Sequence, residues 1–163
     1  MMPKERHILA PYVATPYEVV DRMLELAEVT AEDVVYDLGC GDGRIVVEAA
    51  KRYGARGVGV DIEPYWIEQA RGNAQAAGVE ALVRFEDADA LEVDLGQATV
   101  IMLYLVPWSM QRVGTLLAER AHAGTRVVSH NFEVEGWVPE RTASMTDEEG
   151  SSHKLYLWVI GSP

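Results

Sequence analysis

VVYDLGCGDGR, the stretch from Val34 to Arg44, decides the fold. Val34 to Leu38 has the composition of a short buried strand. Three glycines then follow at every second position, and a helical apolar pattern begins after Arg44. In an open parallel sheet, the turn after the first strand lies beside the ligand, and glycine lets a ligand approach the backbone closely. The stretch therefore predicts a strand, a ligand-binding turn and a helix.

Strands and helices alternate along most of the remaining chain. Strands are expected at 34–38, 57–60, 82–85, 99–105 and 126–129, and helices at 16–28, 44–53, 64–77 and 107–123. After Phe132 the pattern changes to two strands, 142–146 and 154–160, around the turn DEEGSS. The sequence predicts one α/β domain, residues 1–163: a Rossmann-like, doubly wound, mostly parallel seven-stranded sheet with an antiparallel C-terminal hairpin.

Composition narrows the class of protein. A chain of 163 residues with 48% hydrophobic and 25% charged residues is long enough for one full core. Its apolar runs are too short for a membrane span, and the N-terminus has no signal-peptide pattern, so we expect a cytoplasmic protein without membrane contact. The single cysteine, Cys40, excludes an internal disulfide and a cysteine-based zinc cage, and no metal site is predicted.

The formal net charge of −12 bears on the partner. An acidic surface repels phosphate backbones, so RNA or DNA is an unfavourable partner. A basic partner, such as a lysine-rich protein segment, is favoured, although solubility alone also accounts for such a charge.

The residues before the first helix have two interpretations. Thr15, Pro16, Tyr17 and Glu18 read as a capping box with proline at the first helical position. We therefore expect Thr15 to cap the helix. The helix start can also attract a ligand carboxylate.

The glycine turn favours a ligand without phosphate. Its spacing is GxGxG, and Arg44 stands where a dinucleotide-binding fingerprint has glycine or alanine. Asp37 would repel a phosphate but suits an ammonium group, while Asp61 ends the second strand where an acid binds ribose hydroxyls. S-adenosylmethionine (SAM) carries an amino acid and a nucleoside without phosphate, so it is the predicted cofactor. A nicotinamide oxidoreductase is the disfavoured alternative.

On these residues the chain resembles the class I SAM-dependent methyltransferases. VVYDLGCGDGR looks like their first motif, GVGVDIEP their second and VRFEDADALEVDL their third. The resemblance implies a cofactor turn of Asp37, Gly39, Cys40, Gly41 and Gly43. It also implies that Asp61 binds the ribose, Ile62 packs on the adenine, Asp89 receives the adenine amino group and the Ala88 amide meets the ring. On spacing alone, Asp89 reads equally well as a solvated acid.

A closer resemblance covers residues 11–160. PYVATPYEVVDRML, LYLVP, RVVSHNF and HKLYLW look like the small protein-lysine methyltransferases, which include the crenarchaeal broad-specificity enzymes and the ATP synthase c-subunit lysine methyltransferases. The animal members carry a membrane-anchoring segment that this sequence lacks, so a membrane-embedded substrate is not implied. The resemblance also implies that residues 1–15, with Tyr12 and Thr15, fold over the methionine end of SAM.

Candidates for the substrate channel cluster where the fourth and fifth strands end. Tyr104, Trp108, Asn131 and Phe132 are expected to line it, and Tyr104 and His130 are the candidate catalytic residues. An aromatic, apolar channel desolvates a lysine ammonium and attracts it through ring faces, and His130 can accept a proton. The alternatives are core packing for Trp108 and Phe132, and a hydrogen bond to a neighbouring loop for His130.

The sequence leaves three functions open. The leading hypothesis is a SAM-dependent methyltransferase that acts on protein lysines, with a protein carrying accessible lysines as its partner. The first alternative is a methyltransferase for RNA or a small molecule, although residues 103–107 read LYLVP where amino-methylating relatives carry D/N-P-P-Y/F. The second is a SAM-binding sensor or scaffold without turnover.

Overall fold

The computed structural model describes residues 13–161 of the chain. Eleven elements follow one another: α1 (Tyr17–Leu26), β1 (Val34–Leu38), α2 (Arg44–Tyr53), β2 (Arg56–Asp61), α3 (Pro64–Ala76), β3 (Val83–Asp87), β4 (Val100–Leu103), α4 (Pro107–Arg120), β5 (Arg126–His130), β6 (Arg141–Thr146) and β7 (Ser152–Val159). The alternation predicted from the sequence is confirmed, with boundaries that differ by a few residues.

The strands form one seven-stranded sheet in the order β3-β2-β1-β4-β5-β7-β6. The first five strands in this order are parallel, while β7 runs antiparallel to both β5 and β6. The predicted doubly wound sheet with an antiparallel C-terminal hairpin is therefore confirmed. Because the chain reverses its direction of winding after β3, β1 and β4 are neighbours, and their carboxyl ends form the switch point where ligands bind in such sheets.

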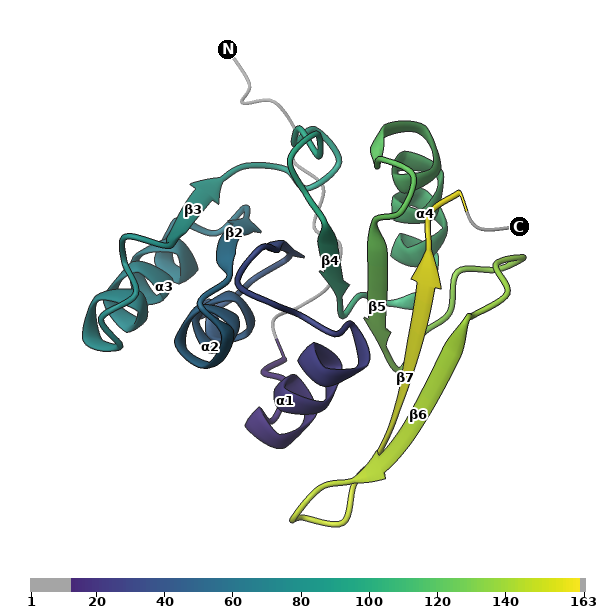
Figure 1. Ribbon diagram of the computed structural model, residues 1–163, viewed down its shortest axis with the longest axis horizontal. Coiled ribbons are helices and arrows are strands. Elements are labelled where there is room, and N and C mark those ends of the chain that lie inside the picture. The colour runs from purple at the N-terminus through teal and green to yellow at the C-terminus, as the bar shows by residue number, and fades with distance from the viewer. Residues whose placement is uncertain (1–12, 162–163) are drawn as a thin grey trace.

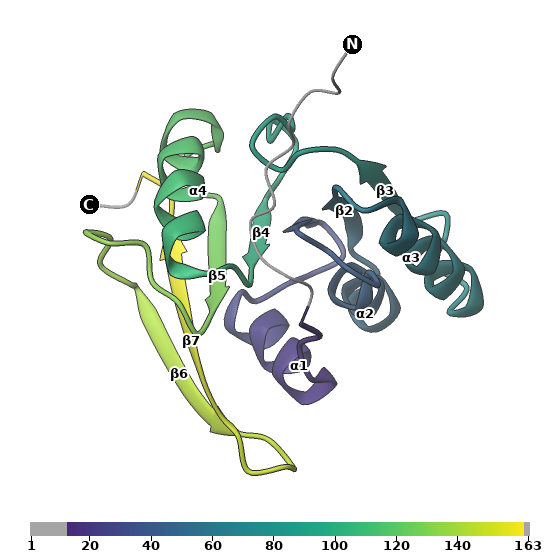
Figure 2. The ribbon, with the colours of Figure 1, turned by 180° about the vertical axis from the view of Figure 1, so that it is seen from behind.

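Two apolar cores cover the two faces of the sheet. The first joins α1, α2 and α3 to side chains such as Met102 and Val128, and the second joins α4 to side chains such as Ile101 and Val127. Adjacent strand residues belong to opposite cores, as the alternating geometry of a strand requires. Figure 1 shows α1, α2 and α3 side by side and apart from α4, and both views show the β6–β7 hairpin projecting beyond the rest of the molecule (Figure 2).

Close packing in the first core depends on a glycine within β2. A Cβ on Gly59 would lie 2.6 Å from Cδ1 of Phe85 and 2.9 Å from Sγ of Cys40. Phe85 on β3 and Cys40 in the glycine turn therefore occupy the space that any larger residue would need.

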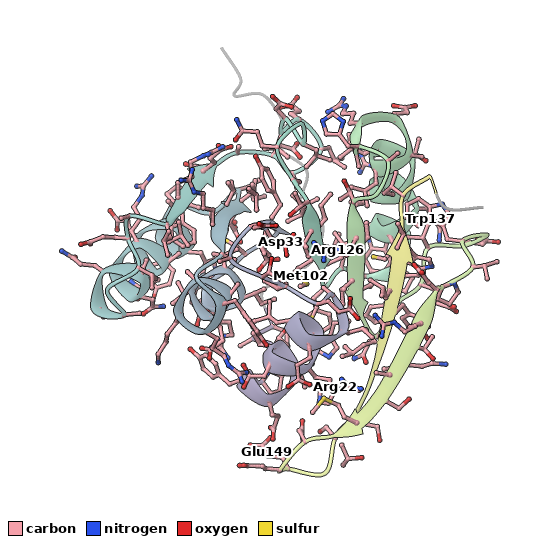
Figure 3. The ribbon with its side chains drawn as sticks, viewed as in Figure 1. Arg22, Asp33, Met102, Arg126, Trp137 and Glu149 are labelled. Atoms are coloured by element: carbon pink, nitrogen blue, oxygen red, sulfur yellow. The ribbon has the colours of Figure 1, made fainter. Side chains whose placement is uncertain are left out.

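An ion pair stabilises the sheet at the amino ends of its parallel strands, opposite the carboxyl ends where ligands bind. Arg126, the first residue of β5, donates hydrogen bonds to the Asp33 carboxylate and, over 2.8 Å, to the carbonyl of Ala27 after α1 (Figure 3). Asp33 also accepts hydrogen bonds of 2.8 Å from the Thr30 amide and the Thr99 hydroxyl. The end of α1 is thereby tied to β1 and β5, which orients the start of α1 toward the carboxyl edge.

The predicted capping box is wrong. Pro16 is the N-cap of α1, the helix begins at Tyr17, and no side chain caps it. The Thr15 hydroxyl lies instead 3.4 Å from Nδ1 of His130, on the strand that α1 packs beside. A tertiary contact thus takes the place of the local cap that the sequence pattern indicated.

No helix within residues 13–161 combines the length and apolar character that crossing a membrane demands.

Candidate functional site

The glycine turn is folded back onto the end of β2. The amides of Gly39 and Cys40 both donate to the carbonyl of Val60, over 2.8 and 2.9 Å. The Gly41 amide donates to Oδ2 of Asp61 over 2.9 Å. These amides are engaged within the protein, so the turn is not an open nest of donors for a pyrophosphate. The geometry agrees with the phosphate-free ligand inferred from the sequence.

Asp37 is a buried acid behind this turn. It is the penultimate residue of β1 and is 4% exposed. Burial, followed by the nearby charges of Asp61 and Asp42, raises the pKa of Asp37 from 3.8 to about 8. Asp37 is therefore largely protonated in the free protein at neutral pH. A cation bound beside it would favour the ionised carboxylate.

Cys40 contributes packing to the turn. Burial, followed by the charge of Asp37, raises the pKa of its thiol well above the usual value. A thiol of this kind is a poor nucleophile, because the thiolate is the reactive form. Cys40 therefore contributes to the glycine turn through its backbone and shape.

The ends of β2 and β3 meet beside the turn. The Asp61 carboxylate also accepts the Glu63 amide over 3.0 Å, and each carboxylate oxygen retains a further lone pair for a ligand hydroxyl. Asp89 is buried and accepts the Leu91 amide over 2.9 Å. The Ala88 amide donates to the carbonyl of Asp61 over 3.0 Å. Because this hydrogen bond already engages the amide, only the position of Ala88 supports the predicted contact with the adenine ring.

The predicted catalytic pair, Tyr104 and His130, is brought together. Their ring centroids are 4.0 Å apart with an interplanar angle of 34°. His130 is fully buried, and burial, with a smaller effect of His153, lowers its pKa from 6.5 to about 4. His130 is therefore neutral at physiological pH and has a ring nitrogen able to accept a hydrogen bond or a proton.

The other substrate candidates lie in different surroundings. Trp108, at the start of α4, is 70% exposed, so it is not a core residue. Phe132 is partly buried against the second core, in agreement with the packing alternative. The Asn131 side chain accepts the Lys154 amide over 3.0 Å and so joins β5 to β7. Tyr12 lies outside the described residues.

Arg44 has a role that its sequence position did not reveal. Its guanidinium binds both carboxylate oxygens of Asp42, at distances of 2.7 to 3.3 Å. It also donates to the carbonyl of Thr15 over 2.9 Å and lies 4.7 Å from the centroid of the Tyr17 ring. Arg44 therefore holds the residues that lead into α1 against the glycine turn. Only the tertiary structure shows this contact, since 29 positions separate Arg44 from Thr15.

His153 and Asp147 are further site residues that were not predicted from the sequence. Nε2 of His130 lies 2.7 Å from Nδ1 of His153, and Nε2 of His153 lies 2.7 Å from Oδ2 of Asp147. No spacing signal could have found this series, because it depends on the antiparallel pairing of β5 with β7.

The sheet, the glycine turn and the two acids at its edge together define a methyltransferase of the Rossmann-like class. The structure of an RNA methyltransferase from Salinibacter ruber in complex with S-adenosyl-L-homocysteine superposes with a TM-score of 0.86, at 50% identity, over 93% of this chain and 95% of that one. Residues 37–141 match the model of the ANTKMT methyltransferase domain. The chain belongs to this family.

Two relatives named as lysine N-methyltransferases are similar to most of the chain. A protein-lysine N-methyltransferase from Saccharolobus islandicus is 42% identical over 93% of this chain and 94% of its own length. The ATP synthase c-subunit lysine N-methyltransferase of Xenopus laevis is 30% identical over 85% of this chain. The match spans 60% of the length of the frog protein, so this chain corresponds to part of it.

Proposed function

We propose that this chain is a SAM-dependent methyltransferase that methylates the ε-amine of protein lysines. The observation that carries the proposal is the position of the contacting Tyr104 and His130 rings beside a glycine turn flanked by buried acids. Membership of a methyltransferase family and 42% identity to a protein-lysine N-methyltransferase over nearly the whole chain support it.

The residues of the turn fit SAM. Asp37 suits the ammonium of its methionine part, Asp61 suits the ribose hydroxyls, and the buried Asp89 suits the adenine amino group. SAM supplies an electrophilic methyl group on a sulfonium when it is bound. The protein has to hold the amine close to that carbon and in line with the sulfur.

The residues that bind the substrate must also remove a proton from the lysine ammonium. A lysine with a pKa near 10.4 is almost fully protonated at pH 7, and its neutral form costs about 4 to 5 kcal/mol. Tyr104 offers a ring face to the ammonium. Neutral His130 offers an acceptor for its proton, and an exposed Trp108 offers apolar surface at the mouth of the channel.

RNA is the second candidate acceptor, because the Salinibacter ruber structure with 50% identity is described as an RNA methyltransferase. The net charge of −12 argues against it, since an RNA-binding surface gains affinity from Lys and Arg. A lysine-rich protein segment is the better match to this charge.

The deciding experiment is incubation of the purified chain with methyl-labelled SAM and a lysate, followed by mass spectrometry of the labelled products. We expect label on lysines of proteins. Label confined to RNA or to small molecules would refute the lysine assignment.

Calorimetric titrations with SAM and with NAD complete the test. We expect micromolar or tighter binding of SAM and no binding of NAD. SAM binding without label in any product would instead support a sensor or scaffold.

A further inference from the structure

A continuous series of polar side chains runs from the end of β5 to the turn of the C-terminal hairpin. It begins at the Thr15 hydroxyl, 3.4 Å from Nδ1 of His130. It continues over 2.7 Å from Nε2 of His130 to Nδ1 of His153, and over 2.7 Å from Nε2 of His153 to Asp147. Its four members come from the entry to α1, β5, β7 and the β6–β7 turn.

The outer end of the series is held in place. The side chains of His153 and Asp147 are 9% and 7% exposed. The other Asp147 oxygen accepts the amides of Glu149 and Ser151, both over 2.9 Å. The hydrogen bond from His153, followed by that from the Ser151 amide, lowers the pKa of Asp147. Asp147 is thus an ionised acceptor at neutral pH.

An ionised Asp147 together with a neutral His153 sets every proton position in the series. A carboxylate only accepts hydrogen bonds, so Nε2 of His153 must carry a proton. When His153 carries no second proton, its Nδ1 is an acceptor, and Nε2 of His130 must donate to it. The remaining nitrogen of neutral His130, Nδ1, keeps its lone pair and faces the Thr15 hydroxyl.

We propose that His153 and Asp147 are positioning residues of the methyl-transfer site, which hold His130 in the tautomer that accepts the proton of the target ammonium at Nδ1. The inference rests on the proposed function. In chemical logic it matches a base that is oriented by a hydrogen-bonded carboxylate, here with a second imidazole between them.

The proton passes from the target ammonium to His130 through the Thr15 hydroxyl. The Thr15 hydroxyl accepts a hydrogen bond from the target ammonium and donates one to Nδ1 of His130. One N–H bond of the ammonium breaks as the hydroxyl passes its own proton to Nδ1. Nε2–H of His130 stays bonded to His153, and Nε2–H of His153 stays bonded to the Asp147 carboxylate. The neutral amine can then attack the methyl carbon, so that the N–C bond forms as the bond from that carbon to sulfur breaks. After the product leaves, His130 returns its proton through the Thr15 hydroxyl to water.

Few other titratable groups face this pair within the described part of the chain. Tyr104 contacts the His130 ring from the end of β4, Asp147 contacts His153 from the turn, and α1 contributes the neutral Thr15 at its entry. The imidazole rings of His130 and His153 are 4.9 Å apart and bond edge to edge. Because each polar atom points at the next, the set does not converge on a metal site, and residues 13–161 contain no such cluster.

The first test is ¹⁵N NMR of the histidine side chains in the free protein, which separates the Nε2–H and Nδ1–H tautomers without any substrate. Wild-type His130 is expected as Nε2–H. His153→Phe removes the acceptor for this proton, so the Nδ1–H form should appear. A wild-type His130 in the Nδ1–H form would overturn the proposal, whatever the protein methylates.

The second test is the pH dependence of lysine methylation. His153→Phe should lower kcat about tenfold to hundredfold at pH 7, the range of general base effects. The defect should shrink toward pH 9.5, where far more of the target lysine is already neutral. Asp147→Asn should be milder, since the Asn oxygen still accepts the His153 proton. SAM affinity should stay within twofold for both variants.

Glu149→Gln is the matched control, because it removes one charge from the same turn and Glu149 points into solvent at the hairpin tip (Figure 3). Its kcat should equal that of the wild type. Equal losses at pH 7 and pH 9.5, or a joint loss of kcat, SAM affinity and melting temperature, would show that His153 and Asp147 only support the fold. Label on RNA alone would refute the proposed function but leave the tautomer result intact.

Discussion

Replacing the buried acid of the glycine turn should stabilise the protein while weakening its cofactor site. In Asp37→Asn the amide has the shape of the protonated acid and no charge to desolvate. The pKa of Asp37 rises from 3.8 to about 8 on folding, an interval of roughly 6 kcal/mol at about 1.4 kcal/mol for each pKa unit. About 4 kcal/mol of this applies at pH 7, as an upper value, because water entering the site solvates the carboxylate.

The direction of the pH effect on stability follows from the linkage between proton binding and folding. Because the folded-state pKa of Asp37 lies above its unfolded-state value, the contribution of this group to stability is complete below a pH of about 4 and is lost as the pH rises to about 8. Asp37→Asn has no such loss. The stability difference between the variant and the wild type should therefore grow by about 4 kcal/mol between pH 5 and pH 8.5.

Urea unfolding of the cofactor-free protein at several pH values measures this difference. Glu119→Gln, at an exposed position on α4, is the charge-matched control and should show no pH-dependent gain. Calorimetry should show that Asp37→Asn binds SAM more weakly, by about 1.5 to 3 kcal/mol, the usual value of a hydrogen bond to a charged group. A stability difference that is the same at pH 5 and pH 8.5 would refute the electrostatic reasoning.

Three further substitutions test the fold and the site. Gly59→Ala should lower the free energy of unfolding by about 1 to 3 kcal/mol in urea titrations, because its Cβ would lie 2.6 Å from Phe85; unchanged stability would contradict this packing. Arg126→Met should cost about 3 kcal/mol, since it leaves the buried Asp33 carboxylate without its cation, and a midpoint equal to the wild type would count against the ion pair. Asp61→Ala should weaken SAM binding by about 1 to 3 kcal/mol in calorimetry, whereas an unaltered affinity would remove Asp61 from the site.

The fold was largely predictable because its signals are local. Strand and helix periodicity, glycine and proline at element ends and the turn DEEGSS each depend on a few neighbouring residues. Even the switch point could be located, since the first strand of an open parallel sheet of this kind lies next to it. The prediction of a capping box at Thr15 was wrong because it too used only local signals. It is a local pattern, and the hydroxyl found a partner on another strand.

The site was predictable in part. Asp37, Asp61 and the glycines follow directly from their places at strand ends, and Tyr104 and His130 meet because their strands are neighbours. The exposure of Trp108 and the bond from Asn131 to Lys154 could not be read from composition or spacing. Both depend on how loops pack against the finished sheet.

The sequence by itself determined the order of elements, the position of the glycine turn and the acids that face it. Only the tertiary structure decided that Arg44 would hold Thr15, that Gly59 would make room for Phe85, and that His130 would meet His153. The physical reason is that periodicity reports which side of an element is buried, whereas contacts between distant residues depend on strand order, register and side-chain direction. Antiparallel pairing of β7 with β5 sets Leu155 opposite His130, and this register brings His153 within hydrogen-bonding distance of the His130 ring.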